Sequence, residues 1–241
     1  MDIKETIIET QQGGVKIVQY NKPSKKNAID QVMYQRVIRI LNDAATDENI
    51  SVMVLTGTGD FYSSGNDFSA PPDDNTGNHL NVLKEYIKAF IMFPKLLVAV
   101  VNGPAIGIAA TTLALCDLVF ASDKSYFLTP FTKLGIVAEG CSTFTFPRIL
   151  GDRKAVEMLL CNHRLSAAEA LEYGFVNCIY KPEEVQSKVW DKIVEVSKFP
   201  KHCITVTKKL LRDSVREELL KVNDKEIQEL NTIWLKGQSK I

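Results

Sequence analysis

A single acidic residue stands alone in a long apolar stretch of the sequence. Between Leu134 and Pro147, in the string LGIVAEGCSTFTFP, Glu139 is the only charged residue. A carboxylate in apolar surroundings loses hydration, so its pKa is expected to rise toward neutrality. Such a group suits a general base that takes a proton and later returns it. The same residues also allow a structural interpretation, in which Glu139 is exposed in a loop or caps a helix that begins near Cys141.

Two glycine-containing turns are further candidates for chemistry. The first, FYSSGND at 61–67, follows a predicted strand, and the second, NGPAIGI at 102–108, joins an apolar strand to an apolar helix. Either turn can leave backbone N–H groups directed outward. The second also lies at a helix N-terminus, where amide donors lack partners and the dipole favours negative charge. Two amides that converge on one point form an oxyanion hole; two ordinary tight turns are the alternative interpretation.

Several other kinds of site find no support in the sequence. The three histidines share no metal-binding spacing, and neither HExxH nor a GxGxxG or Walker-type phosphate motif occurs. The 29 basic and 29 acidic residues give a net charge of zero, without the basic field of a nucleic-acid binder. We therefore expect no metal, no cofactor apart from the substrate's own groups, and no nucleic-acid partner.

The overall composition indicates a folded, reduced and membrane-free domain. Of the 241 residues, 45% are hydrophobic and 24% are charged, which is ordinary for a globular protein. Five cysteines without a CxxC pair indicate free thiols in an intracellular compartment. The first residues resemble neither a signal peptide nor a mitochondrial transit peptide. The apolar run from Leu96 to Ala121 is interrupted by Asn102-Gly103-Pro104 and Asp117, so it predicts a buried strand, turn and helix.

The elements that would position these residues alternate along the first half of the chain. Short apolar strands separated by helices predict an α/β fold whose sheet is covered on both faces. From Thr143 onward helical patterns dominate, and Ser69–Asn78 reads as a mobile surface loop. The expected strands are Lys16–Tyr20, Ser51–Leu55, Leu96–Val101, Leu118–Ala121 and Val176–Tyr180; the expected helices are Asp30 (as cap) to about Ala45, Leu80–Phe93, Ile106–Cys116, Lys201–Leu211 and Val215–Leu235.

These segments together resemble the crotonase, or enoyl-CoA hydratase/isomerase, superfamily over nearly the whole chain. Each fragment is weak alone, but their order and spacing are specific. The matching fragments are Asn21-Lys22-Pro23 with Lys26-Asn27-Ala28, Ser63-Ser64-Gly65-Asn66-Asp67, Val101 to Gly107, Cys116-Asp117, Leu165 to Ala170, and Gly174-Phe175-Val176.

The resemblance implies a crotonase-like spiral of ββα units over 1–195. A helical C-terminal section over 196–241 would belong to the same structural domain and build a homotrimer or a dimer of trimers. The implied ligand is an acyl-CoA thioester, held at an oxyanion hole made by the N–H groups of Ser64 and Ile108. The residues expected to bind substrate are Lys26, Ala28, Ser64, Gly65, Asn66, Asp67, Phe68, Gly107 and Ile108.

Two departures from the family pattern narrow the expected reaction. Hydratases of this family are similar to one another in having two glutamates, and this chain has Thr111 and Phe131 at those places. Glu139 instead stands where Δ3,Δ2-enoyl-CoA isomerases keep a single base. Its surroundings, Ala138-Glu139-Gly140-Cys141-Ser142, look most like the peroxisomal branch. The resemblance thus implies an isomerase of 3-enoyl-CoA; dienoyl-CoA isomerisation, weak hydration with Asp67 or Glu85 as a second acid, and non-catalytic acyl-CoA binding or scaffolding are the alternatives.

The expected location is the peroxisome, with cytoplasm and mitochondrion as alternatives. The sequence given ends in Ser239-Lys240-Ile241, which differs by one conservative change from the Ser-Lys-Leu signal that peroxisomal import reads. The corresponding partner would be the peroxisomal import receptor. A short polar tail without a signal is the other interpretation.

Overall fold

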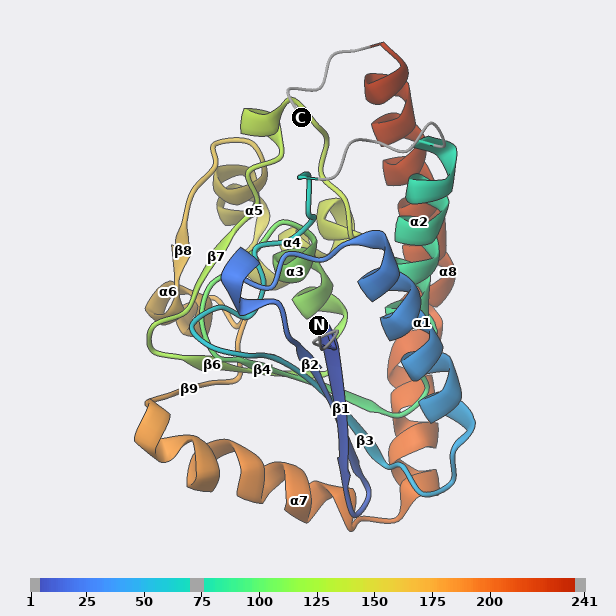
Figure 1. Cartoon of the computed structure of the whole chain (residues 1–241), viewed down its shortest axis with the longest axis vertical. Helices are drawn as coiled ribbons and strands as arrows, with labels where there is room; N and C mark the ends of the chain where they lie inside the picture. Colours follow the sequence, from blue (N-terminus) through green and yellow to red (C-terminus); the bar gives the residue numbers. More distant parts are fainter. Residues whose placement is uncertain (1–4, 70–75, 237–241) are drawn as a thin grey trace.

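A six-stranded sheet forms the centre of the computed structural model, which describes residues 5–69 and 76–236 (Figure 1). The strands lie in the order β1-β2-β3-β4-β6-β9; β1 runs antiparallel to β2, and all other neighbours are parallel. A second, smaller sheet has the order β5-β7-β8. The strands are β1 (Ile7–Gln12), β2 (Val15–Tyr20), β3 (Val52–Gly57), β4 (Leu96–Val101), β5 (Ala105–Ile106), β6 (Leu118–Ser122), β7 (Tyr126–Leu128), β8 (Leu165–Ser166) and β9 (Cys178–Tyr180).

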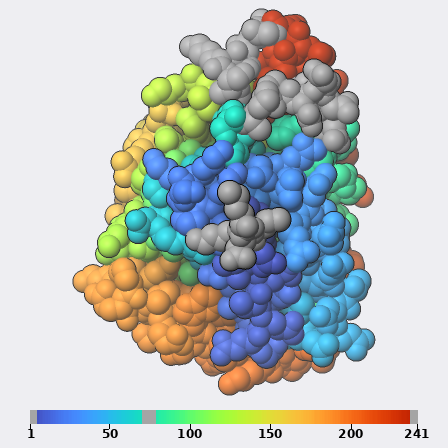
Figure 2. Space-filling view, viewed as in Figure 1, coloured from blue at the N-terminus to red at the C-terminus, as the bar shows by residue number. Residues whose placement is uncertain are grey.

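Helices stand on both sides of the large sheet. In Figure 1, α1, α2 and α8 lie side by side, whereas α7 lies across the sheet from them. Figure 2 shows the same face with its side chains, where the orange segment containing α7 forms the lower edge. The helices are α1 (Gln31–Thr46), α2 (Thr76–Met92), α3 (Ile108–Thr111), α4 (Ser142–Leu150), α5 (Asp152–Leu159), α6 (Ala167–Glu172), α7 (Asp191–Ser197) and α8 (Lys201–Leu235), with short helical turns at Pro23–Lys25, Thr112–Leu115, Thr132–Leu134, Pro182–Glu184 and Gln186–Trp190.

The side chains of β3 show how the sheet is buried. Met53 and Leu55 join a large hydrophobic cluster with residues of α1, α2 and α8, whereas Val52 and Val54 join a second cluster with Ile193 of α7. Successive side chains of a strand point to opposite faces, so a strand that is apolar at every position needs cover on both. The predicted two-sided α/β sheet is therefore confirmed.

Most of the predicted elements are present, with boundary shifts of a few residues. Asp30 caps α1, because its carboxylate accepts a hydrogen bond from the Met33 N–H at 2.9 Å. The strand over 96–101 has the predicted bounds. Strands β1, β5, β7 and β8 were not predicted, since three of them are only two or three residues long and β1 ends in polar residues.

The predicted helix Ile106–Cys116 is wrong at both ends. Ile106 belongs to β5, where it pairs with Leu128. Gly107 then adopts φ 59° and ψ −128°, a conformation that only glycine adopts readily and that separates the strand from α3. The helix continues only to Thr111 before it tightens into the turn Thr112–Leu115.

The two predicted C-terminal helices are one continuous helix, α8. Charged residues in and around the gap between the two predicted helices form ion pairs: Asp213 pairs with Lys209 and Arg216, while Arg212 reaches Asp117 at 3.0 Å. Because no glycine or proline intervenes, these contacts allow the helix to continue. The expected start of the C-terminal section, residue 196, falls in the last turn of α7, and α8 shares the large hydrophobic cluster through Leu219, Ile227 and Leu230.

The predicted loop at 69–78 is also partly wrong, because α2 already begins at Thr76. Residues 70–75 of that loop, like the tripeptide 239–241, lie outside the described residues. Within the described ranges, no helix has the length and apolarity needed to cross a membrane. The same residues contain no group of three or more His, Cys, Asp or Glu side chains placed to hold a metal ion.

Candidate active site

The two glycine turns identified in the sequence lie against each other. Ser63 and Ala105 form an isolated parallel bridge, and the Ile106 N–H donates to the Ser63 carbonyl oxygen at 3.0 Å. Gly65 has φ +85°, and a Cβ atom added there would lie 2.6 Å from the Ile106 carbonyl oxygen. Glycine at position 65 is therefore required by both backbone conformation and space. The structure brings together the two backbone segments from which an oxyanion hole would be built.

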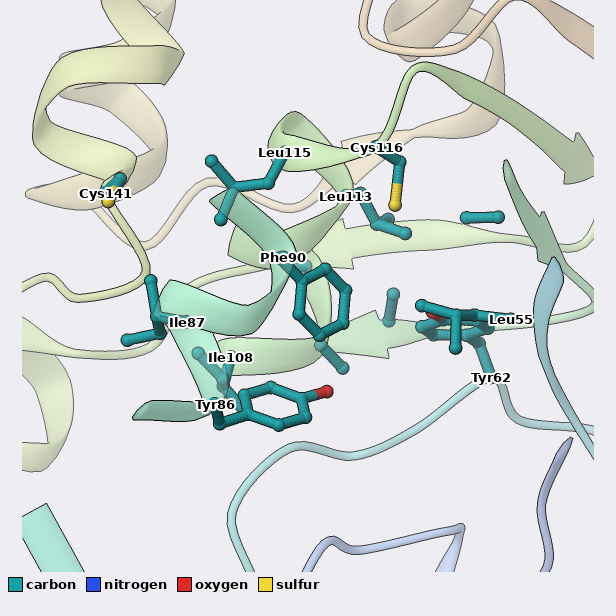
Figure 3. Close-up of a cluster of buried hydrophobic side chains, with 14 of the residues drawn as sticks. Leu55, Tyr62, Tyr86, Ile87, Phe90, Ile108, Leu113, Leu115, Cys116 and Cys141 are labelled. Carbon is teal, nitrogen blue, oxygen red and sulfur yellow. The ribbon is translucent and has the colours of Figure 1, made fainter. Parts of the chain in front are cut away.

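The second turn presents a free amide at the start of α3. The Ile108 side chain is fully buried and belongs to the same hydrophobic cluster as Tyr86 (Figure 3), so the residue is anchored in the core. The Ile108 N–H donates to no acceptor in the part of the chain that the structure describes. A Cβ atom added at Gly107 would meet nothing within 4 Å, so the space next to this turn is open. The Ile108 amide thus has the properties of an anion-binding donor.

The first turn differs from this expectation in one respect. The Ser64 N–H donates to the Lys26 carbonyl oxygen at 2.9 Å. Lys26 and Asn27 both have left-handed backbones, with φ 54° and 56°, and the buried Asn27 side chain holds them by donating to the Phe61 carbonyl at 2.7 Å. Ser64 can therefore act as an oxyanion donor in only two ways. Its N–H either leaves the Lys26 carbonyl oxygen for the ligand oxygen or donates to both at once.

Glu139 is buried and its carboxylate is unpaired. The residue is 1% exposed, and neither carboxylate oxygen has a hydrogen-bond partner among the described residues. Burial, together with the nearby charge of Glu226, raises the pKa of Glu139 to about 8. The interpretation of Glu139 as an exposed loop residue is wrong. Helix α4 does begin at Ser142, but the Glu139 carboxylate does not cap it. Instead, the backbone carbonyl oxygen of Glu139 accepts a hydrogen bond from the Ser142 hydroxyl at 2.7 Å.

Gly140 fixes the Glu139 segment against α3. A Cβ atom added at Gly140 would lie 2.1 Å from Thr111 Oγ1 and 3.4 Å from Ile108 Cδ1. Gly140 also has φ +71°, in the left-handed region. This close approach packs the backbone segment that carries Glu139 against the short helix whose first amide is free. A base and an anion-binding donor are thereby held in one region.

Tyr34 connects the first turn to the same region. Its hydroxyl donates to the side-chain oxygen of Asn66, and its ring packs edge-on against Tyr86 with ring centroids 4.6 Å apart. Burial raises the pKa of Tyr34 well above its usual range, and the charge of Glu139 raises it further. Tyr34 is therefore a neutral hydrogen-bond donor that fixes the Asn66 side chain and is itself near enough to Glu139 to feel its charge.

The remaining predicted binding residues surround the first turn. Asp67 is fixed by Lys22 at 2.7 Å and Lys25 at 3.3 Å. Although burial alone would raise the pKa of Asp67, hydrogen bonds from Lys22, Ser69 and Lys25 lower it below its usual range. Asp67 is thus a fixed structural anion. Lys26 is exposed, with its Nζ 5.2 Å from the Phe61 ring centroid; Ala28 is buried, and Phe68 is exposed.

A second carboxylate does reach the site, from a residue that the sequence analysis missed. Glu85, considered in the sequence, is exposed and pairs with Lys88. Glu226 of α8 is instead 6% exposed and accepts a hydrogen bond from the Cys141 N–H at 2.7 Å. In the sequence Glu226 is one acid among many in a charged helix, so no local signal distinguishes it.

Comparisons with known proteins show what the whole chain is similar to. Residues 10–240 match the family described as "Enoyl-CoA hydratase/isomerase". The human protein "Enoyl-CoA delta isomerase 2" is 41% identical over 97% of this chain, and the chain spans 61% of that relative's length. Mouse "Enoyl-CoA delta isomerase 3, peroxisomal" is 42% identical over 91% of this chain and 71% of its own. The crystal structure of an enoyl-CoA hydratase from Bacillus halodurans superposes with a TM-score of 0.90 at 25% identity, covering 98% of both chains.

Proposed function

Because the chain belongs to the enoyl-CoA hydratase/isomerase family, we propose that it is a Δ3,Δ2-enoyl-CoA isomerase. It would move the double bond of a cis- or trans-3-enoyl-CoA to the trans-2 position in fatty-acid β-oxidation. The observation that carries the proposal is the buried Glu139 carboxylate, unpaired within the described residues, in a segment whose Gly140 packs against the helix that begins with the free amide of Ile108. The chain spans less than two thirds of the human relative, so the activity is proposed for the segment described here.

In the proposed reaction Glu139 is the only acid–base group. Its carboxylate takes a proton from C2 of the 3-enoyl thioester, and the C–H electrons form a dienolate over C2, C3 and C4. Protonation of C4 by the same carboxyl group leaves the double bond between C2 and C3. A base that must return its proton works best with a pKa near the working pH, which the value of about 8 for Glu139 supports.

The thioester oxygen carries the negative charge of the dienolate. We propose that the Ile108 N–H and the Ser64 N–H bind this oxygen, with Ser64 releasing or sharing its hydrogen bond to Lys26. Amide donors at the oxyanion are a strong source of stabilisation, since removal of one oxyanion donor elsewhere costs about 2.7–4 kcal/mol. Lys26, Ala28, Gly65, Asn66, Asp67, Phe68 and Gly107 are proposed to surround the acyl-CoA.

The residues present disfavour the alternative of hydration. Water addition in this family is associated with two glutamates, and the corresponding residues here are the buried Thr111 and Phe131. Neither can transfer a proton. Asp67, the other acid near the first turn, is engaged by two lysines, and Glu226 is engaged by the donors of Cys141 and Thr143.

One assay tests the proposed activity directly. Purified protein is given 3-enoyl-CoA and 2-enoyl-CoA in parallel. Conversion of the first to trans-2-enoyl-CoA, with little hydration of the second, is the expected result. If hydration is the faster reaction, or if dienoyl-CoA is the only substrate, the protein has another activity of the family and the isomerase proposal is wrong. No turnover with measurable acyl-CoA binding would indicate a non-catalytic protein.

We also propose that the C-terminal section builds a homotrimer, or a dimer of trimers. Several large apolar side chains of α8 and its approach are exposed, with fractions of 48% for Phe199, 54% for Val206, 71% for Leu210 and 72% for Leu211. Exposed apolar side chains gathered on one element support an interface. Sedimentation equilibrium of the protein, and of a Leu210→Glu variant, tests this assignment; a monomer in both would contradict it.

A peroxisomal location is proposed on the strength of the mouse relative, whose name carries that location. Cytoplasm and mitochondrion remain the alternatives. Import would use Ser239-Lys240-Ile241 and its receptor, and these residues lie outside the described part of the chain. A fluorescent protein ending in the last twelve residues should gather in peroxisomes. Diffuse fluorescence, unchanged by deletion of the tripeptide, would contradict the proposal.

A further inference from the structure

Glu226 of α8 binds the first residues of a different helix, α4. Helix α4 begins after Cys141, which has a left-handed backbone with φ 60° and offers no capping side chain. The acceptor comes instead from α8. Glu226 Oε2 accepts from the Cys141 N–H at 2.7 Å, and Oε1 accepts from the Thr143 N–H at 3.1 Å and from Thr143 Oγ1 at 2.6 Å. Three donors thus bind one buried carboxylate from a distant part of the chain.

The backbone that Glu226 holds is the backbone that orients Glu139. Gly140 and Cys141 have positive φ angles in succession, so the chain turns sharply between Glu139 and α4. Gly140 adopts this conformation freely, but for the non-glycine Cys141 it costs energy and persists only where surrounding contacts impose it. Besides the contacts of Glu226, the Cys141 thiol lies 3.4 Å from the Leu219 carbonyl oxygen of α8. Helix α8 therefore holds this turn at two points.

Glu226 also provides charge next to a base that has no direct partner. The titratable groups that face Glu139 in the described part of the chain are Glu226 from α8, Tyr34 from α1 and the neighbouring Cys141 thiol. Burial keeps Tyr34 and Cys141 neutral by raising the pKa of each. Burial raises the pKa of Glu226 as well, to about 7, while its three hydrogen bonds favour the anion. Glu226 is thus the group whose negative charge acts on Glu139.

We propose that Glu226 is a positioning residue for the Glu139 base, which it serves by holding the Gly140–Thr143 turn and by placing a negative charge behind it. The inference rests on the proposed isomerase function. A like charge favours the protonated form of Glu139 and so strengthens the carboxylate as a base. The turn geometry determines where that carboxylate lies relative to the free Ile108 amide. Neither effect requires Glu226 to touch the substrate.

Two substitutions separate charge from geometry. Glu226→Gln keeps size and one acceptor but removes the charge. The acid limb of its kcat/KM profile should move to lower pH by about one unit or more. Glu226→Asp keeps the charge but is too short to reach both backbone donors. Its acid limb should stay in place while kcat falls by about tenfold or more and KM changes little. Glu229→Gln, an exposed site on the same helix, is the matched control and should behave as wild type.

The outcomes distinguish this inference from the proposed function. Wild-type protein without isomerase activity, or a fully active Glu139→Gln variant, would remove the proposed function. With wild-type activity and a required Glu139, two results overturn only the role of Glu226: folded Glu226→Gln with the acid limb of wild type, or folded Glu226→Asp with wild-type kcat. If circular dichroism shows that neither variant folds, Glu226 is a folding residue and the positioning role is rejected.

Discussion

Gly140 lies so close to Thr111 that a Cβ atom at position 140 would be 2.1 Å from the Thr111 hydroxyl oxygen. This contact determines how near the Glu139 segment comes to α3 and to the free amide of Ile108. The hydroxyl belongs to a buried side chain on a rigid short helix, so it cannot move aside freely.

Gly140→Ala should therefore displace Glu139 and lower kcat by about 10²-fold, because small misplacements of a reacting group are costly. The binding of a saturated acyl-CoA should change less. Gly13→Ala, another positive-φ glycine with nothing within 4 Å, is the matched control for backbone strain alone. Equal effects of the two variants on kcat would show that the Thr111 contact has no catalytic consequence.

Glu139→Gln tests the base itself. The substitution keeps the size of the side chain but removes its ability to take a proton. We expect kcat to fall by at least about 10²-fold, with folding and acyl-CoA binding retained. Isomerase rates, circular dichroism and a binding titration check the three expectations. An activity near that of wild type would show that another group transfers the proton.

The raised pKa of Glu139 also predicts how stability depends on pH. The folded protein holds the Glu139 proton up to about pH 8, whereas an unfolded chain releases it near the usual value of 4.5. The contribution of this group to stability is thus complete below pH 4.5 and is lost as pH rises through 8. Glu139→Gln removes that loss, so its stability relative to wild type should rise between pH 5 and pH 9 by a few kcal/mol.

Urea unfolding at pH 5, 7 and 9 measures this difference. The exposed Glu229→Gln substitution serves as the control and should give the same offset from wild type at every pH. A Glu139→Gln offset that is also independent of pH would mean that Glu139 ionises in the folded protein as it does in water.

Gly65 tests the first turn. Gly65→Val introduces a β-branched side chain at φ +85°, where its Cβ would lie 2.6 Å from the Ile106 carbonyl oxygen. The two turns must then separate. The loss of transition-state stabilisation calculated from kcat should exceed the loss in the free energy of unfolding. Gly13→Val places the same residue at a positive φ in open space. Full activity of Gly65→Val would remove the oxyanion role of this turn.

The local pattern of the sequence was sufficient for much of the fold. Apolar residues at every position of 96–101 and 52–55 predicted strands buried on both faces, and the two hydrophobic clusters confirm this. Asp30 predicted the start of α1 through its capping side chain. Such signals are reliable because strand burial and helix capping depend on residues that are neighbours in the chain. The predicted helix start at Ile106 was wrong, because this residue pairs with β7, a strand farther along the chain.

The identity of the candidate base was also available from the sequence, since Glu139 is the only charge in its segment. Its surroundings were not. That the Ser64 amide donates to Lys26, that Gly140 packs on Thr111, and that Glu226 faces the same turn are contacts between segments far apart in the chain. Hydrophobic periodicity records whether a residue is buried, but not which distant group it meets. The residue types therefore came from the sequence, whereas the electrostatics and spacing of the site were decided by how α8 and the two turns pack together.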